Sequence, residues 1–285
     1  MRKYVICFIT AIVLAACDDD FGLNGQASSQ LIVEGWIEDG GFPIVMLTRS
    51  FPVSTEYQST DALEDYMLRW AKVTLSNGTD SVVLTGKYDE GYFPPFVYTT
   101  SYMKGEAGRQ YMLTVDYRDY HATATTTIPS VPRDCVFKVE RCSDNDTLCR
   151  LKATFSDNLS EKNYYQFFVR VGVATKQYQA SYLGAYDDTV LGEVTEVPVY
   201  RGHQMDFKEY IPFFTLDDTL SVKFANIDET SFRIWDSYAK MLSLSSNMFL
   251  STSTNMYSNI NGGLGYWCGY ATITDHIVIR DSVGR

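Results

Sequence analysis

The sequence predicts an all-β fold in two parts: an N-terminal immunoglobulin-like or transthyretin-like β-sandwich, and a second β-rich domain that carries one amphipathic helix. Three observations support this prediction. The chain contains 21 tyrosines and 16 phenylalanines, which favour strands over helices. Its apolar residues occur in short alternating runs between turn residues, as they do in strands. Its 285 residues also exceed the usual size of a single core.

The predicted N-terminal domain spans residues 30–131. Its short alternating or β-branched runs are expected to form strands, which we place at residues 31–36, 44–49, 71–75, 81–85, 111–117 and 121–128. The pair Asn77-Gly78 is expected to close one hairpin, because these residues accept the positive φ angles of a tight turn. About seven short strands in about 100 residues are typical of a sandwich. The proline-containing segment 129–132 is the predicted boundary.

The predicted second domain spans residues 132–285. Strands are placed at residues 164–173, 194–200, 207–214, 219–225 and near 276–280. One helix is expected near residues 228–244, with Asp228 as its N-cap, and we expect it to pack on a sheet edge. Apolar residues recur there at helical spacing: Phe232, Trp235, Ala239 and Leu242. The segment 178–191 is rich in tyrosine and glycine and is expected to be a loop.

The first 16 residues have the features of an export signal. Two basic residues precede an apolar run, and small residues precede Cys17. The run is too short to cross about 30 Å of hydrocarbon. Residues 14–17, with the sequence LAAC, match a lipobox, so Cys17 is predicted to carry a lipid anchor and to become the new N-terminus. The alternative is an ordinary cleaved signal followed by an incidental cysteine.

Three aspartates follow Cys17, and residues 17–29 are predicted to form a flexible acidic tether. An acidic run in this place also resembles the surface-export signal of Bacteroidota lipoproteins, which would put the protein on the outer face of the outer membrane. The formal net charge of −11 opposes nucleic-acid binding, so no nucleic-acid partner is expected.

Four cysteines follow the anchor, and an even number in an exported protein suggests disulfides. Cys142 and Cys149 flank a short polar turn and are the predicted local pair. This choice leaves Cys135 and Cys268 as the other pair. The acidic turn between Cys142 and Cys149 could alternatively bind Ca²⁺, although it lacks the spaced ligand set of a calcium loop.

No catalytic residue, metal site or cofactor is predicted. The three histidines are isolated in the sequence, and zinc, nucleophile-elbow and phosphate-loop motifs are absent. Gly262, Gly263 and Gly265 could cradle a phosphate, but they lack the strand and helix context of such a loop. We therefore expect them to form a structural turn or bulge. A carboxylate pair for glycoside cleavage stays open, because such pairs meet in space rather than in sequence.

Aromatic residues are in surplus, and two segments concentrate them. Tyr178, Tyr182 and Tyr186 lie in the predicted loop and are candidate contacts to a small molecule, a glycan, a peptide or a protein partner. The second group surrounds Pro94 and Pro95 and fits a core and a binding surface equally well. Its members are Tyr88, Tyr92, Phe93, Phe96, Tyr98 and Tyr102.

Three segments occur in a particular order along the chain: LIVEGWI at residues 31–37, GRQYMLTV at 108–115 with TIP at 127–129, and SNINGGLGY at 258–266. Together they resemble the Bacteroidota lipoprotein family called domain-of-unknown-function family 4249. Members are typically encoded beside TonB-dependent outer-membrane transporters, so the resemblance implies an accessory role in uptake and a transporter as partner. It supplies no catalytic residues. The chain departs from the family pattern at Trp267 and Cys268, so its disulfide pairing would be particular to this member.

We therefore expect an outer-membrane lipoprotein, exposed at the cell surface, that serves as a non-catalytic binding or accessory subunit of a TonB-dependent nutrient transporter. Two alternatives stay open. One is an extracellular hydrolase built on a β-sandwich, and the other is a structural adhesin or assembly subunit.

Overall fold

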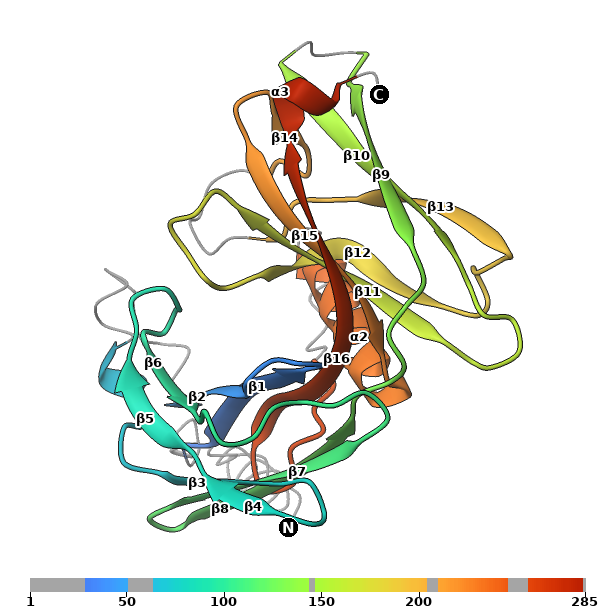
Figure 1. Cartoon of the computed structure of the whole chain (residues 1–285). Helices are drawn as coiled ribbons and strands as arrows, with labels where there is room; N and C mark the ends of the chain where they lie inside the picture. Colours follow the sequence, from blue (N-terminus) through green and yellow to red (C-terminus); the bar gives the residue numbers. More distant parts are fainter. Residues whose placement is uncertain (1–28, 51–63, 144–146, 204–209, 246–255, 284–285) are drawn as a thin grey trace, which may run out of the picture.

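The computed structural model describes residues 29–50, 64–143, 147–203, 210–245 and 256–283 (Figure 1). An eight-stranded central sheet runs through the whole molecule in the order β12-β11-β15-β16-β1-β2-β6-β5. Its strands are β1 (Leu31–Glu38), β2 (Ile44–Arg49), β5 (Thr85–Tyr88), β6 (Phe96–Thr99), β11 (Tyr164–Val171), β12 (Gln179–Asp187), β15 (Thr219–Ile227) and β16 (Leu264–Val278).

β1 and β16, the first and last strands of the residues that the structure describes, lie side by side at the centre of this sheet. β1 pairs with β16 in parallel, from Ile32 opposite Leu264 to Glu38 opposite Tyr270, while its other edge pairs with β2 in antiparallel orientation. β16 is long enough to pair with β1 along one edge and with β15 along the other. Figure 1 shows it in dark red, running from β1 in the lower part of the molecule to β15 in the upper part.

Two smaller sheets pack on the central sheet. One has the order β4-β3-β7-β8 and contains β3 (Lys72–Ser76), β4 (Ser81–Val83), β7 (Gln110–Tyr117) and β8 (Tyr120–Thr127). In the other, β10 pairs with β9, β13 and β14; its strands are β9 (Cys135–Arg141), β10 (Leu148–Ser156), β13 (Val194–Val199) and β14 (Phe214–Thr215). Successive side chains of a strand point to opposite faces. On β16, Trp267 and Ala271 enter the first core and Ile277 enters the second, so both small sheets cover the same face of the central sheet.

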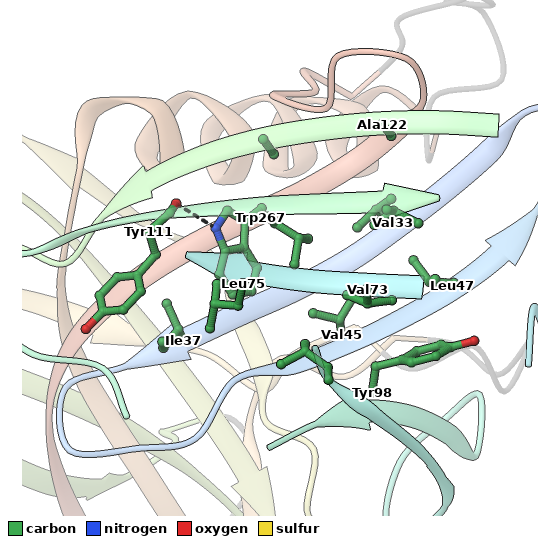
Figure 2. Close-up of a cluster of buried hydrophobic side chains, with 14 of the residues drawn as sticks. Val33, Ile37, Val45, Leu47, Val73, Leu75, Tyr98, Tyr111, Ala122 and Trp267 are labelled. Atoms are coloured by element: carbon green, nitrogen blue, oxygen red, sulfur yellow. Dashed lines mark hydrogen bonds between the residues drawn. The ribbon is translucent and has the colours of Figure 1, made fainter. Parts of the chain in front are cut away.

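The first core lies between the central sheet and the β4-β3-β7-β8 sheet (Figure 2). β1 alternates strictly between buried and partly buried residues, and Leu31, Val33 and Ile37 are fully buried. Trp267 fills the centre, and its indole nitrogen donates a hydrogen bond of 3.1 Å to the backbone oxygen of Tyr111. A buried indole N–H needs such a partner, so this bond fixes how the ring sits in the core.

The second core lies under the β9, β10, β13 and β14 sheet and is rich in phenylalanine. Phe155, Phe167 and Phe224 come from three strands. The Phe224 ring lies 4.5 Å from that of Phe155 and 5.0 Å from that of Phe167. The two cores confirm the prediction of an all-β, sandwich-like fold.

The opposite face of the central sheet carries helix α2 (Glu229–Ser245), which confirms the predicted helix. The helix packs Ile234 and Trp235 against Phe168 of β11 and Tyr270 of β16. It therefore lies on the sheet face, rather than at the edge where we expected it. A four-residue helix, α3 (Ile279–Ser282), follows β16. Within the described residues, no helix combines the length and the apolar character needed to cross a membrane.

Asp228 caps α2 and also ties it to the first sandwich. Its Oδ1 accepts a bond of 2.7 Å from the backbone N–H of Ser231. Its Oδ2 accepts bonds from Thr126 Oγ1 at 3.1 Å and from the Thr127 backbone N–H at 3.0 Å. Thr126 Oγ1 in turn accepts the backbone N–H of Gly269. A single carboxylate thus links the helix, β8 and β16.

Replacing Asp228 by alanine is expected to lower the free energy of unfolding by roughly 2–3 kcal/mol, because the cap is lost and the Thr127 N–H loses its acceptor. Urea denaturation monitored by circular dichroism measures this change. The matched control is Asp236→Ala, which removes only an exposed ion pair with Lys240 on the same helix and should change stability by less than about 0.5 kcal/mol. Equal stability losses in the two variants would contradict the linking role of Asp228.

Three sequence predictions need correction or comment. The expected loop at 178–191 is largely strand β12. Of the strand expected at 207–214, the described part contains only the short β14, Phe214–Thr215, and residues 204–209 lie outside the described chain. The strand expected near 276–280 is the end of β16, followed by α3. The division of the chain at residues 131 and 132 stays a prediction, but its two parts share the central sheet.

Candidate ligand-binding pocket

A pocket of about 350 Å³ opens on the α2 side of the central sheet. This volume lies at the lower end of the range for small-molecule sites, roughly 300–1,000 Å³. Its lining comes from seven strands, from α2, from the turn between β1 and β2, and from the segments that precede β6 and β12. The lining residues are Trp36, Glu38, Gly41, Phe42, Ile44, Lys87, Tyr92, Thr99, Phe168, Lys176, Gln177, Tyr178, Lys223, Trp235, Tyr266 and Tyr270.

Strand alternation explains why these side chains meet. The odd-numbered residues of β1 fill the first core, so Trp36 and Glu38 project to the opposite face. Register then places Glu38 beside Tyr270 on β16. Further across the sheet, Lys223 of β15 pairs with Phe168 of β11, so both side chains lie on this same face. The core residues and the pocket residues are thus interleaved along the same strands.

Half of the residues that line the pocket are aromatic. The ring centroids of Trp36 and Tyr92 are 6.3 Å apart, and those of Trp235 and Tyr266 are 5.2 Å apart. Phe168 lies 4.8 Å from Tyr270. The indole nitrogen of Trp235 and the hydroxyl of Tyr270 are buried, and the Tyr270 hydroxyl lies beside Trp235 and Cys268. The wall therefore offers mainly ring faces to a ligand.

An ion pair lies in the lining between these rings. Lys223 Nζ lies 2.6 Å from Oε1 and 2.7 Å from Oε2 of Glu38, and both side chains are less than one-fifth exposed. Thr272 Oγ1 donates a longer bond of 3.4 Å to the same carboxylate. The ammonium group also lies 4.2 Å from the ring centroid of Tyr178, whose hydroxyl is 2.6 Å from Ser221 Oγ. The acid and the cation thus neutralise each other inside an aromatic pocket.

Two loops meet at the edge of the pocket. Lys176 bonds both carboxylate oxygens of Asp89 at 2.9 Å, and its backbone N–H donates to the oxygen of Gly91 at 2.8 Å. The backbone N–H of Phe93 donates to Gln177 Oε1 at 3.0 Å. The bond from Lys176 holds the pKa of the Asp89 carboxyl below its usual range. These contacts join the loop before β6 to the loop before β12, so each half of the chain supplies one side of the opening.

Burial shifts the pKa of several titratable groups near the pocket. Burial raises the pKa of the Tyr92, Tyr266 and Tyr270 hydroxyls. Burial also raises the pKa of Glu34, whose neighbours include the hydroxyls of Tyr238 and Tyr266. Within the described residues, no group of three or more His, Cys, Asp or Glu side chains could hold a metal ion. The chemistry that the lining offers is stacking and hydrogen bonding.

A second cavity of about 350 Å³ lies over β10 and β13. Its charged groups are already engaged on the sheet surface. Lys152 pairs with Glu196 at 3.3 Å, and the Arg150 guanidinium lies 5.5 Å from the Phe213 ring. Because it has far fewer ring faces than the first pocket, we regard the first as the candidate site.

The structure separates the three tyrosines chosen from the sequence. Tyr178 lines the pocket. Tyr182 instead bonds Ser243 Oγ of α2 at 3.0 Å, and the ring of Tyr186 packs against Phe167 of the second core. Their spacing along the chain suggested one shared surface. In the structure, however, the three side chains contact the pocket, α2 and the second core, respectively. Of the second aromatic group, Tyr92 lines the pocket, whereas Tyr98 is buried in the first core.

Gly262 and Gly263 lead into β16 and Gly265 is its second residue, where the backbone passes close to other strands. Gly262 and Gly265 have φ angles of +90° and +105°. A Cβ on Gly262 would overlap the backbone oxygen of His121, and one on Gly263 would lie 2.8 Å from the backbone oxygen of Leu31. Glycine at these positions therefore allows the backbone to pass close to the backbone of the neighbouring strands.

The cysteine predictions need correction, because Cys135, Cys142, Cys149 and Cys268 are all free thiols in the structure. The expected hairpin of β9 and β10 is present. However, Cys149 lies opposite Arg141, so Cys142 is offset by one position from it across the hairpin. Cys268 lies in the α2 cluster and Cys135 packs on the second core, so the central sheet separates them. Burial raises the pKa of Cys268 and of Cys135 to about 12. Cys17 lies outside the described residues.

Most pocket residues were not selected from the sequence. Trp36, Glu38, Lys223, Trp235 and Tyr266 are scattered over the chain and follow no motif. One signal was present in the sequence. The strand at residues 31–38 alternates apolar core residues with Glu34, Trp36 and Glu38. This alternation places charged and aromatic side chains on the second face of the strand. Such a face needs a partner or a ligand.

Fold and site define an all-β protein whose two sandwiches share one sheet and whose aromatic pocket lies on the face of that sheet that carries α2. A family model described as a domain of unknown function (DUF4249) matches residues 18–275. The chain belongs to this family, in agreement with the resemblance seen in the sequence. No curated protein matches the chain.

Proposed function

We propose that this protein is a non-catalytic binding lipoprotein that captures a ligand for a TonB-dependent nutrient transporter of the outer membrane. The observation that carries the proposal is the aromatic pocket with the Glu38–Lys223 pair in its lining. Aromatic rings and a neutralised ion pair bind a ligand well, but they do not activate a nucleophile for catalysis. Among the described lining residues Glu38 is the only carboxylate, whereas most glycosidases need two. For this reason we propose binding rather than hydrolysis.

The location in the cell forms part of this proposal. We propose that the first 16 residues are removed, that Cys17 carries the lipid, and that the acidic tether directs the protein to the exterior of a Bacteroidota outer membrane. The order of LAAC and the aspartates supports this location. The transporter as partner rests on the sequence resemblance.

The test is purification of the C-terminally tagged chain from its own membranes in mild detergent. We expect mass spectrometry to find a lipid on Cys17, and we expect a TonB-dependent transporter to co-purify. The matched control is Cys17→Ala, which should lose both the lipid and the membrane fraction. An unmodified full-length N-terminus would overturn the anchor, and recovery of the lipidated protein without any transporter would overturn the accessory role.

A further inference from the structure

We infer that the ligand of this pocket is a neutral carbohydrate, with one sugar ring stacked on Trp36 and its hydroxyls bound by the Glu38–Lys223 pair. This inference rests on the proposed binding function and adds the chemical class of the ligand. It follows from the ring faces and from the state of the ion pair.

The ring faces come first. Trp36 is partly buried and lines the pocket, with Tyr92 beside it at 6.3 Å. An aromatic face carries a partial negative charge, and it attracts the slightly positive C–H bonds on the flat side of a sugar ring. The tilt of 46° between the two rings means that they do not stack on each other. Because the Trp36 side chain lines the pocket and is only partly buried, part of its ring surface is open to a ligand.

The ion pair explains why the ligand should be neutral. Lys223 uses two of its three N–H donors on Glu38, while the carboxylate keeps acceptor capacity beside them. A donor and an acceptor thus lie next to each other, and a hydroxyl can use both at once. An anionic ligand would compete with Glu38 for Lys223, and a cationic ligand would compete for Glu38. Either would leave one partly buried charge unpaired, which is costly.

The experiment titrates the mature, detergent-solubilised protein with maltotriose, cellotriose, mannotriose and xylotriose, followed by tryptophan fluorescence and calorimetry. Trigalacturonate represents an acidic sugar and trialanine represents a peptide. We expect at least one neutral trisaccharide to bind, and we expect Trp36→Ala to weaken that binding by at least roughly tenfold. The control is Trp70→Ala, whose side chain is 89 % exposed outside the pocket and which should bind normally.

The ion pair is tested by the double variant Glu38→Gln/Lys223→Met, which removes both charges together and so leaves no buried charge unpaired. We expect an unchanged melting temperature with at least roughly tenfold weaker binding of the sugar. Full affinity in the double variant would overturn the role of the pair. Binding of only trigalacturonate or trialanine, abolished by Trp36→Ala, would overturn the carbohydrate inference and leave the binding function standing. If none of the six probes binds, the carbohydrate inference falls, and transporter co-purification still decides the proposed function separately.

Discussion

Replacing Gly265 by alanine is expected to destabilise the protein by roughly 4 kcal/mol or more. Gly265 pairs with Val33 across the parallel β1–β16 contact, and its φ angle is +105°. A Cβ there would overlap the backbone oxygen of Val33. Because the Cβ is bonded directly to the backbone of β16 and the oxygen belongs to the backbone of β1, neither atom can move without separating the two strands. Urea unfolding monitored by tryptophan fluorescence measures the effect.

Alanine substitutions at two other glycines distinguish the two causes of the lost stability, which are backbone strain and steric overlap. Gly78 has a φ angle of +86°, but apart from its chain neighbours no residue that the structure describes lies within 4 Å of the place that a Cβ would occupy, so Gly78→Ala measures the backbone strain alone. Gly192 has neither a positive φ nor a close contact, and Gly192→Ala should change stability by less than about 0.5 kcal/mol. A Gly265→Ala protein as stable as Gly78→Ala would show that β1 and β16 are not packed this closely.

Truncating Trp267 to alanine should lower the free energy of unfolding by roughly 3–5 kcal/mol. The side chain is fully buried in the first core, and its removal leaves both a large cavity and the Tyr111 oxygen without its donor. Equilibrium unfolding in urea, followed by circular dichroism, measures the loss.

Trp70→Ala is the control for Trp267→Ala, because it removes the same side chain from a site that is 89 % exposed and should change stability by less than about 0.5 kcal/mol. Trp267→Phe should fall between the two, because it keeps much of the ring volume but loses the bond to Tyr111. A small effect of Trp267→Ala would mean that the first core does not depend on β16.

Local patterns in the sequence predicted much of the secondary structure. The run at residues 44–49 coincides with β2, and the run at 31–36 falls within β1. The spacing that begins at Asp228 predicted α2 to within one residue at each end. In these elements apolar periodicity, capping and packing all favour the same structure, and agreement of this kind makes a local prediction reliable.

β12 was missed because its sequence carries loop signals that the fold accommodates. Its pairing with β11 is interrupted between Gln166 and Phe168, and Leu183 has a φ angle of +54°. A bulge of this kind admits residues such as Gly184 that otherwise indicate a turn. The turn residues are present in the sequence, but pairing with β11 makes this segment a strand.

The pairing of β1 with β16 and the pocket could not be read from one sequence for a related reason. Both depend on which strands become neighbours, and nothing within residues 31–38 specifies a partner almost a whole chain away. Once that pairing is known, the alternation of β1 assigns Val33 to the core and Trp36 to the pocket. Tyr178 was found because tyrosines cluster near it, whereas Lys223 carries no local signal at all.

The parallel contact between β1 and β16 also governs when the molecule can fold. β1 is synthesised first, yet one of its edges has no partner until the last strand has left the ribosome. Such pairing has a high contact order, so it forms late and the growing chain carries an open strand edge in the meantime. A chain that ends before β16 lacks the strand that joins the two sandwiches, so only the full-length product can complete the sheet and, with it, the pocket.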